Sequence, residues 1–83
     1  METPKKLEEK DVNRFNLTKQ ECEYILENAN FNKIQENVFK RLTSKYGRQS
    51  IVKISIEEEI STATVNRIIK EIKKRIYRLL LNE

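Results

Sequence analysis

The feature that most constrains this chain is an apolar stripe at helical spacing in its C-terminal third. Wound at 100° per residue, the aliphatic side chains of residues 65–80 all lie within about 60° of one line. They are Val65, Ile68, Ile69, Ile72, Ile76, Leu79 and Leu80. Close to the opposite line lie Ala63, Arg67, Lys70, Lys74 and Arg78. This pattern predicts a long helix over residues 62–80 with one buried face and one basic face.

The rest of the chain also favours helices. Its 83 residues are enough for one small domain, and they include one Gly and one Pro. Its β-branched residues recur at helical spacing, so we expect an all-α fold, a four-helix bundle spanning residues 17–83. Residues 1–16 mix charges of both signs with few apolar groups, and we expect them to form a flexible arm.

Two capping boxes predict where the first two helices start. Thr18 precedes Glu21, and Asn32 precedes Gln35, at the spacing in which two residues each bond the other's backbone amide. Apolar residues at helical spacing follow each box, namely Cys22, Ile25, Leu26 and Ala29, and then Ile34, Val38, Phe39 and Leu42. We expect the first helix to end near residues 28–30 and the second at Gly47, which can adopt a left-handed conformation without penalty.

Residues 50–76 have the pattern of a helix-turn-helix. Ser50 is placed to begin a short helix, with core contacts from Ile51, Ile54 and Ile56, and Ser61 to cap the long one. Ser55 is small enough for a second helix to cross closely. Residues 57–59 lead into the turn, and Ile60 anchors it. A short helix, a tight turn and a longer basic helix form the unit that places a helix in the DNA major groove.

Charge is distributed unevenly along the chain. The net charge is +4, but residues 1–46 carry nine basic and eight acidic side chains, which nearly cancel. Residues 61–80 carry six basic side chains and one acidic one, Glu71. This asymmetry indicates a polyanionic partner for the C-terminal segment.

Several function classes are disfavoured. There is no histidine, nucleophile elbow or phosphate loop, so we expect no enzyme activity, metal or cofactor. The single cysteine, Cys22, lies on an apolar stripe and is expected to pack as a small hydrophobe. No secretory signal and no apolar run of about 20 residues is present, and we expect no membrane association and a cytoplasmic, nucleoid-associated protein.

The segment around the predicted turn reads IS-x-x-TV, at residues 60–65, and a basic helix follows. Upstream, Phe31-Asn32-x-x-Gln35-x-x-Val38-Phe39 stands where a Leu-Thr-x-x-Glu-x-x-Val-Leu pattern is usual, and Ser50 and Ile54 fit an S-x-x-E-I-A pattern. Residues 31–76 thus resemble the promoter-reading region of bacterial sigma factors and the DNA-binding module of LuxR-type regulators, as found in small phage and mobile-element regulators.

Three residues depart from that family pattern. Lys53 replaces the usual Glu, Ser55 replaces the usual Ala, and Glu58 occupies a position that is commonly apolar. A buried, unpaired carboxylate costs several kcal/mol. We therefore expect Ile56 to take over the packing and the short helix to turn slightly.

The resemblance implies a DNA-reading surface on the long helix. The expected base contacts are Thr62, Ala63, Asn66, Arg67 and Lys70. Their chemistry suits the role, since arginine can bond guanine, asparagine can bond adenine, and a methyl group can meet thymine. The expected phosphate contacts are Arg48, Ser50, Lys53, Thr64, Lys73 and Lys74.

The sequence leaves the partner open between two classes. The first is duplex DNA, read by a transcription regulator that in a sigma-like variant also contacts RNA polymerase. The second is another regulatory protein, bound by the same scaffold without reading DNA. A homodimer through Ile76, Leu79 and Leu80 is a further expectation, because this end of the helix is more apolar than a small domain needs.

Overall fold

The computed structural model describes residues 15–43 and 49–81, and within these ranges the chain is helical without strands. The helices are α2 (Lys19–Asn28), α3 (Lys33–Leu42), α4 (Ile51–Glu58) and α5 (Thr62–Leu81). This confirms the all-α prediction and the predicted helical bundle. The predicted arm lies outside the described residues up to residue 14.

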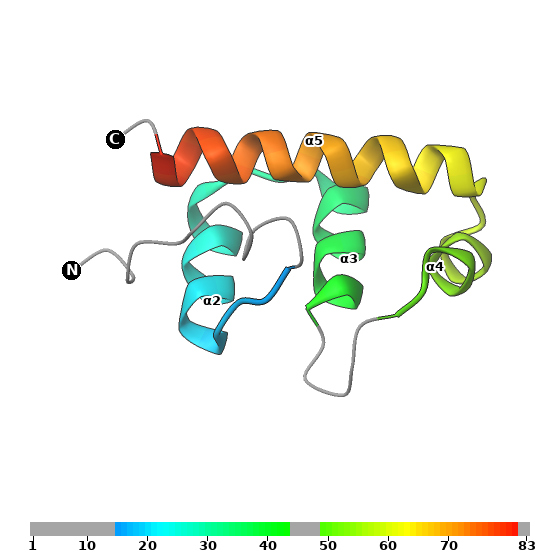
Figure 1. The fold of residues 1–83 in the computed structure, drawn as a ribbon, viewed down its shortest axis with the longest axis horizontal. Coiled ribbons are helices and arrows are strands. Elements are labelled where there is room, and N and C mark those ends of the chain that lie inside the picture. Colours follow the sequence, from blue (N-terminus) through cyan, green and yellow to red (C-terminus); the bar gives the residue numbers. More distant parts are fainter. Residues whose placement is uncertain (1–14, 44–48, 82–83) are drawn as a thin grey trace.

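The longest helix, α5, is the element against which the others pack. Figure 1 shows α5 running across α4, α3 and α2 in turn, from its N-terminal end to its C-terminal end. A helix of 20 residues is about 30 Å long, enough to span all three neighbours. The position of α5 is therefore set along its whole length by the rest of the fold.

The predicted apolar stripe of α5 forms the centre of the core. Val65, Ile68, Ile72 and Ile76 are buried, whereas Ile69, Leu79 and Leu80 are half-buried at its edge. The other helices contribute residues to the same cluster, among them Ile25, Val38, Phe39 and Ile54. The prediction that one face of the long helix is buried is therefore confirmed.

Phe15 also belongs to the core, although the sequence places it in the flexible arm of residues 1–16. It is only 7% exposed, and its ring meets that of Phe39 edge-on at a centroid distance of 6.3 Å. An aromatic ring that finds such a partner gains from burial even without a helix around it. The packed core therefore includes Phe15, two residues before the expected start of the domain at Leu17.

Both predicted capping boxes are present. The amide of Glu21 donates to Thr18 Oγ1 at 3.1 Å, and the amide of Thr18 donates to Glu21 Oε1 at 2.8 Å. Asn32 and Gln35 form the equivalent pair at 2.9 and 3.1 Å. The helix starts were predictable because these bonds span only three residues.

The expected end of the second helix is wrong. The structure ends α3 at Leu42, whereas the sequence suggested Gly47, which lies outside the described residues. Thr43 leaves the helical conformation, and its hydroxyl donates to the carbonyl of Phe39 at 2.8 Å. That side chain supplies a local bond at the helix end, in the manner in which threonine competes with helical structure.

Two of the three expected core contacts of α4 are also wrong. Ile54 is fully buried, but Ile51 is 36% exposed and Ile56 is 69% exposed. Residues two apart on a helix point about 200° away from each other, so Ile54 and Ile56 cannot both face the core. Ser55 is buried instead, as expected for a small residue at a close helix crossing.

Candidate nucleic-acid interface

Three residues, 59–61, connect α4 to α5 and hold the two helices in a fixed relation. Glu59 has a left-handed backbone, with φ 57° and ψ 44°. Its amide donates to the carbonyl of Ile56 at 3.3 Å, and the amide of Ile60 donates to that of Ser55 at 3.0 Å. This is the Schellman arrangement, which satisfies the last carbonyls of a helix and turns the chain sharply.

The start of α5 is capped as the sequence predicts. Ser61 Oγ accepts a hydrogen bond from the amide of Thr64 at 3.1 Å, and the two hydroxyls lie 2.9 Å apart. The first turn of α5 is therefore anchored within three residues of the end of α4. The short connection and the cap together set the direction in which α5 leaves the turn.

Arg41 resolves the conflict that Glu58 poses in the sequence. The Glu58 side chain is only 11% exposed, and Arg41 Nε donates to its Oε2 at 2.7 Å. Arg41 also bonds the carboxylate of Glu57, and Gln49 Oε1 at 3.3 Å. The hydrogen bond to Glu58, with a smaller contribution from Glu57, raises the pKa of Arg41 above its ordinary value. The expectation that Ile56 replaces Glu58 in the packing is wrong, because the carboxylate is paired instead.

All five predicted base-contacting residues are exposed on the first half of α5. They are Thr62, Ala63, Asn66, Arg67 and Lys70. Within residues 15–43 and 49–81, neither Arg67 nor Lys70 takes part in an ion pair. Ala63, Arg67 and Lys70 lie on the face opposite the buried stripe, and Thr62 and Asn66 lie at its flank, so the polar groups of this row are available to a ligand.

Part of the predicted phosphate-contacting set lies around one hollow. Ser50 and Lys73 line an open hollow of about 360 Å³, together with Asn66 from the predicted base-contacting set and Phe15. Lys73 Nζ lies 5.7 Å from the centroid of the Phe15 ring, within range of a cation–π contact. The start of α4 therefore lies beside the middle of α5, on the edge of its exposed face.

The remaining residues of that set are dispersed or already engaged. Lys53 is exposed on α4 with its Nζ 4.0 Å from a carboxylate oxygen of Glu57, and Thr64 is half-buried beside Ser61. Lys74 is exposed on the second half of α5, whereas Arg48 lies outside the described residues. The sequence grouped these residues by charge and helix position, but their distances from one another depend on the fold.

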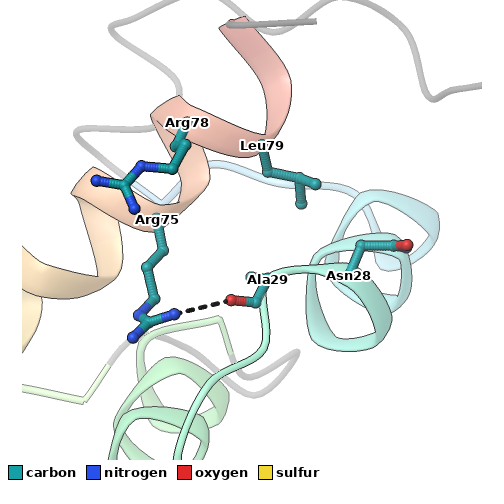
Figure 2. Close-up of a pocket in the computed structure, with 5 residues that line it drawn as sticks. All are labelled: Asn28, Ala29, Arg75, Arg78 and Leu79. Carbon is teal, nitrogen blue, oxygen red and sulfur yellow. Dashed lines mark hydrogen bonds between the residues drawn. The ribbon is translucent and has the colours of Figure 1, made fainter.

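Arg75 has a role that sequence reasoning missed. One of its terminal nitrogens donates at 3.3 Å to the carbonyl of Ala29, where α2 has ended (Figure 2). The same nitrogen donates to the carbonyl of Asn30 at 3.4 Å. A cation at a helix C-terminus complements the partial negative charge of the last carbonyls. The sequence hinted at this role, because Arg75 lies between the buried and basic lines of α5. The carbonyls that it bonds could not be identified, because they lie more than 40 residues away in sequence.

The C-terminal end of α5 bears on the expected homodimer. Ile76 is fully buried within a single chain, so it offers no surface to a second copy. Leu79 and Leu80 are half-buried at the edge of the core.

Within the described residues, none of the helices has the length and apolar character needed to cross a membrane.

Other chemistry within residues 15–43 and 49–81 is limited. No three His, Cys, Asp or Glu side chains gather there to hold a metal ion. Burial raises the pKa of the half-buried Cys22 thiol, although a hydrogen bond with Thr43 partly opposes this. A raised pKa lowers the thiolate fraction and with it the reactivity of the sulfur.

No protein-family model matches this chain, and comparisons with curated proteins and with solved structures found no match either.

Proposed function

We propose that this protein is a sequence-specific regulator that binds double-stranded DNA by placing α5 in the major groove. The observation that carries the proposal is the exposed row Asn66, Arg67 and Lys70, on a helix whose opposite face is buried. A recognition helix needs both properties, since it must be held rigidly while its side chains reach base edges. The three-residue connection to α4 adds the tight turn of a helix-turn-helix.

Each exposed residue of the first half of α5 has a partner chemistry in the groove. The guanidinium of Arg67 can donate two hydrogen bonds to guanine, and the amide of Asn66 can bond adenine at two atoms. The methyl group of Ala63 suits contact with thymine. These contacts supply sequence preference, whereas Lys70 adds a cation at the same surface.

The surroundings of α5 suit contact with the DNA backbone. Ser50 and Lys73 lie beside Asn66, where a phosphate group flanking the groove can be held. The acidic end of α4 repels DNA less than its sequence suggests, because Arg41 is paired with both Glu57 and Glu58.

In a sigma-like role α2 would face RNA polymerase. The protein would then be a cytoplasmic, nucleoid-associated regulator without catalytic activity.

The test of DNA binding is fluorescence anisotropy of the full chain with labelled duplexes at several salt concentrations. Cognate duplexes are first selected from a random pool. We expect the affinity for DNA to fall steeply as the salt concentration rises, because lysine and arginine side chains release counterions from the phosphates when they bind. Absence of binding to any duplex at low salt would exclude the proposal.

Two substitutions separate base reading from backbone binding. Arg67→Ala should weaken the selected duplex by about 1–3 kcal/mol and relax base preference, because it removes a bidentate contact. Lys74→Ala should weaken selected and random duplexes alike and reduce the salt slope by about one. Lys40→Ala, which removes an exposed lysine from α3, is the matched control and should leave binding unchanged. Identical behaviour of the first two variants on both duplexes would mean that the base-reading face is wrongly assigned.

A second candidate is a protein-interaction module in which the basic face of α5 meets an acidic protein. The observation that favours it is the exposure of Val52 and Ile56 on α4, at 59% and 69%. Exposed aliphatic side chains on a small domain are more useful against a protein than against DNA. A stable complex with an acidic protein, in the absence of any duplex binding, would favour this candidate over the first.

A further inference from the structure

A second hollow lies between the C-terminal half of α5 and the start of α3. It is open, has a volume of about 360 Å³, and is lined by Asn32, Gln35, Glu71, Lys74, Arg75 and Arg78. Every one of these side chains is polar. Three of them are cations that come from two successive turns of α5, so the hollow collects positive charge on one flank of the helix.

The three cations differ in how firmly they are held. Arg75 is half-buried and fixed by its bonds to Ala29 and Asn30, which use one terminal nitrogen. The other guanidinium nitrogens make no hydrogen bond to the described residues. Arg78 lies one turn further along α5, and with Arg75 it also lines a neighbouring hollow beside Asn28 and Ala29, which Figure 2 shows. A fixed guanidinium with unused donors is preorganised to bind an oxyanion.

The charge balance of the hollow also favours an anion. Lys74 and Arg78 are exposed and have no ion-pair partner among the described residues. Glu71 is the one acid in the lining, and its carboxylate accepts a hydrogen bond from Gln35 at 3.4 Å. Three cations against one carboxylate leave an excess of positive charge. An anion placed among them would relieve the mutual repulsion of the cations.

We propose that this hollow binds a phosphate group, held by Arg75, Arg78 and Lys74. We take this phosphate to belong to the backbone of the DNA duplex that α5 reads, and this assignment rests on the proposed function. Base reading then belongs to the first half of α5, while the second half and the start of α3 grip the backbone. A free phosphate-bearing small molecule has the same chemistry, and the experiment distinguishes the two sources.

The first measurement titrates the full chain with inorganic phosphate at constant ionic strength, followed by NMR. We expect saturable shifts of the side-chain Nε–H signals of Arg75 and Arg78. Arg78→Gln should weaken the binding about tenfold, because one charged donor is lost. Glu71→Gln should tighten it about two- to fivefold, because it removes the opposing charge and keeps an oxygen for Gln35. Lys40→Gln, at the other end of α3, is the control. Absence of saturable shifts at both arginines would overturn the site.

The second measurement repeats the variants with selected and random duplexes. At about 0.1 M salt, Arg78→Gln should weaken both about five- to tenfold, since one phosphate contact changes the salt slope by about 0.9. Glu71→Gln should tighten both. If duplexes bind and neither substitution alters the affinity, the backbone source is overturned while the proposed function stands. If phosphate saturates the hollow but no duplex binds, the site stands with a small phosphorylated ligand and the proposed function fails.

Discussion

At the scale of single residues, Arg41 compensates the charge of the two acids that end α4. Its guanidinium lies between α3 and α4 and bonds both Glu57 and Glu58. Glu58 is largely withdrawn from water, so its charge needs a partner in the fold. The pair therefore positions the helix that precedes the connection to α5, although neither residue belongs to the proposed DNA-reading face.

Replacing Arg41 should destabilise the fold by more than the loss of an exposed surface ion pair does. We expect Arg41→Ala to lower the free energy of unfolding by about 1–3 kcal/mol, because it leaves the Glu58 carboxylate without its donor. Urea denaturation followed by circular dichroism measures this. Lys40→Ala removes the neighbouring lysine from an exposed pair with Glu36 and should cost less than about 1 kcal/mol. Equal costs for the two variants would show that the Arg41 network contributes no more than a surface pair.

The residue scale also marks a limit of prediction from sequence. The sequence identifies Glu58 as out of place, because a carboxylate stands where the pattern is apolar. It does not identify Arg41 as the answer, because the two residues are 17 positions apart and meet only after α3 and α4 have packed. The role of Arg75 at the end of α2 was missed for the same reason.

At the scale of elements, the connection between α4 and α5 depends on a left-handed residue that is not glycine. For an L-residue with a β-carbon, this conformation costs about 1–2 kcal/mol. Glu59 bears the cost so that the amides of Glu59 and Ile60 can bond the last carbonyls of α4. The capped start of α5 follows two residues later. Local backbone strain is therefore located at the turn that orients the long helix.

Substitutions at Glu59 should reveal this strain. Glu59→Gly should raise the free energy of unfolding by up to about 1 kcal/mol, because glycine adopts the left-handed region freely. Glu59→Val should lower it, since a β-branched residue is poorly accommodated there. The control is Glu23→Gly in the interior of α2, which should destabilise by about 0.5–1 kcal/mol. If glycine destabilises both positions equally in thermal denaturation, the turn is not strained.

Element starts could be read from the sequence better than element ends. The caps at Thr18, Asn32, Ser50 and Ser61 use side-chain bonds to amides three residues away, so the information is local. α3 ends at Leu42, where the Thr43 hydroxyl bonds the carbonyl of Phe39, and a hydroxyl at that position does not reliably stop a helix. The exposed face of α5 was predictable from its period alone. The hollow beside α3 was not, because it requires the register of two helices.

At the scale of the whole molecule, α5 ties α2, α3 and α4 to one core. Its buried stripe contacts α4, α3 and α2 along successive turns (Figure 1). A small domain built around one element has no independent part that can remain folded when that element is loosened. We therefore expect unfolding to be a single cooperative transition.

A single methylene removed from the stripe should test this. Ile72→Val should lower the free energy of unfolding by about 0.5–1.5 kcal/mol, because Ile72 is fully buried. The same change at the exposed Ile56 should alter it by less than about 0.5 kcal/mol. Far-ultraviolet circular dichroism and tyrosine fluorescence should report one common midpoint for Ile72→Val. Two separate midpoints would mean that α5 does not couple the other helices.

The division of α5 into a buried and an exposed face has a consequence for how such a protein can diversify. Substitutions at Asn66, Arg67 and Lys70 change exposed side chains, so they carry little thermodynamic penalty. Substitutions at Val65, Ile68 or Ile72 disturb the packing of the whole chain. If α5 reads DNA as proposed, base preference can therefore be rewritten one residue at a time on a scaffold that stays intact. The same separation makes α5 a suitable helix on which to build a library of variants with altered specificity.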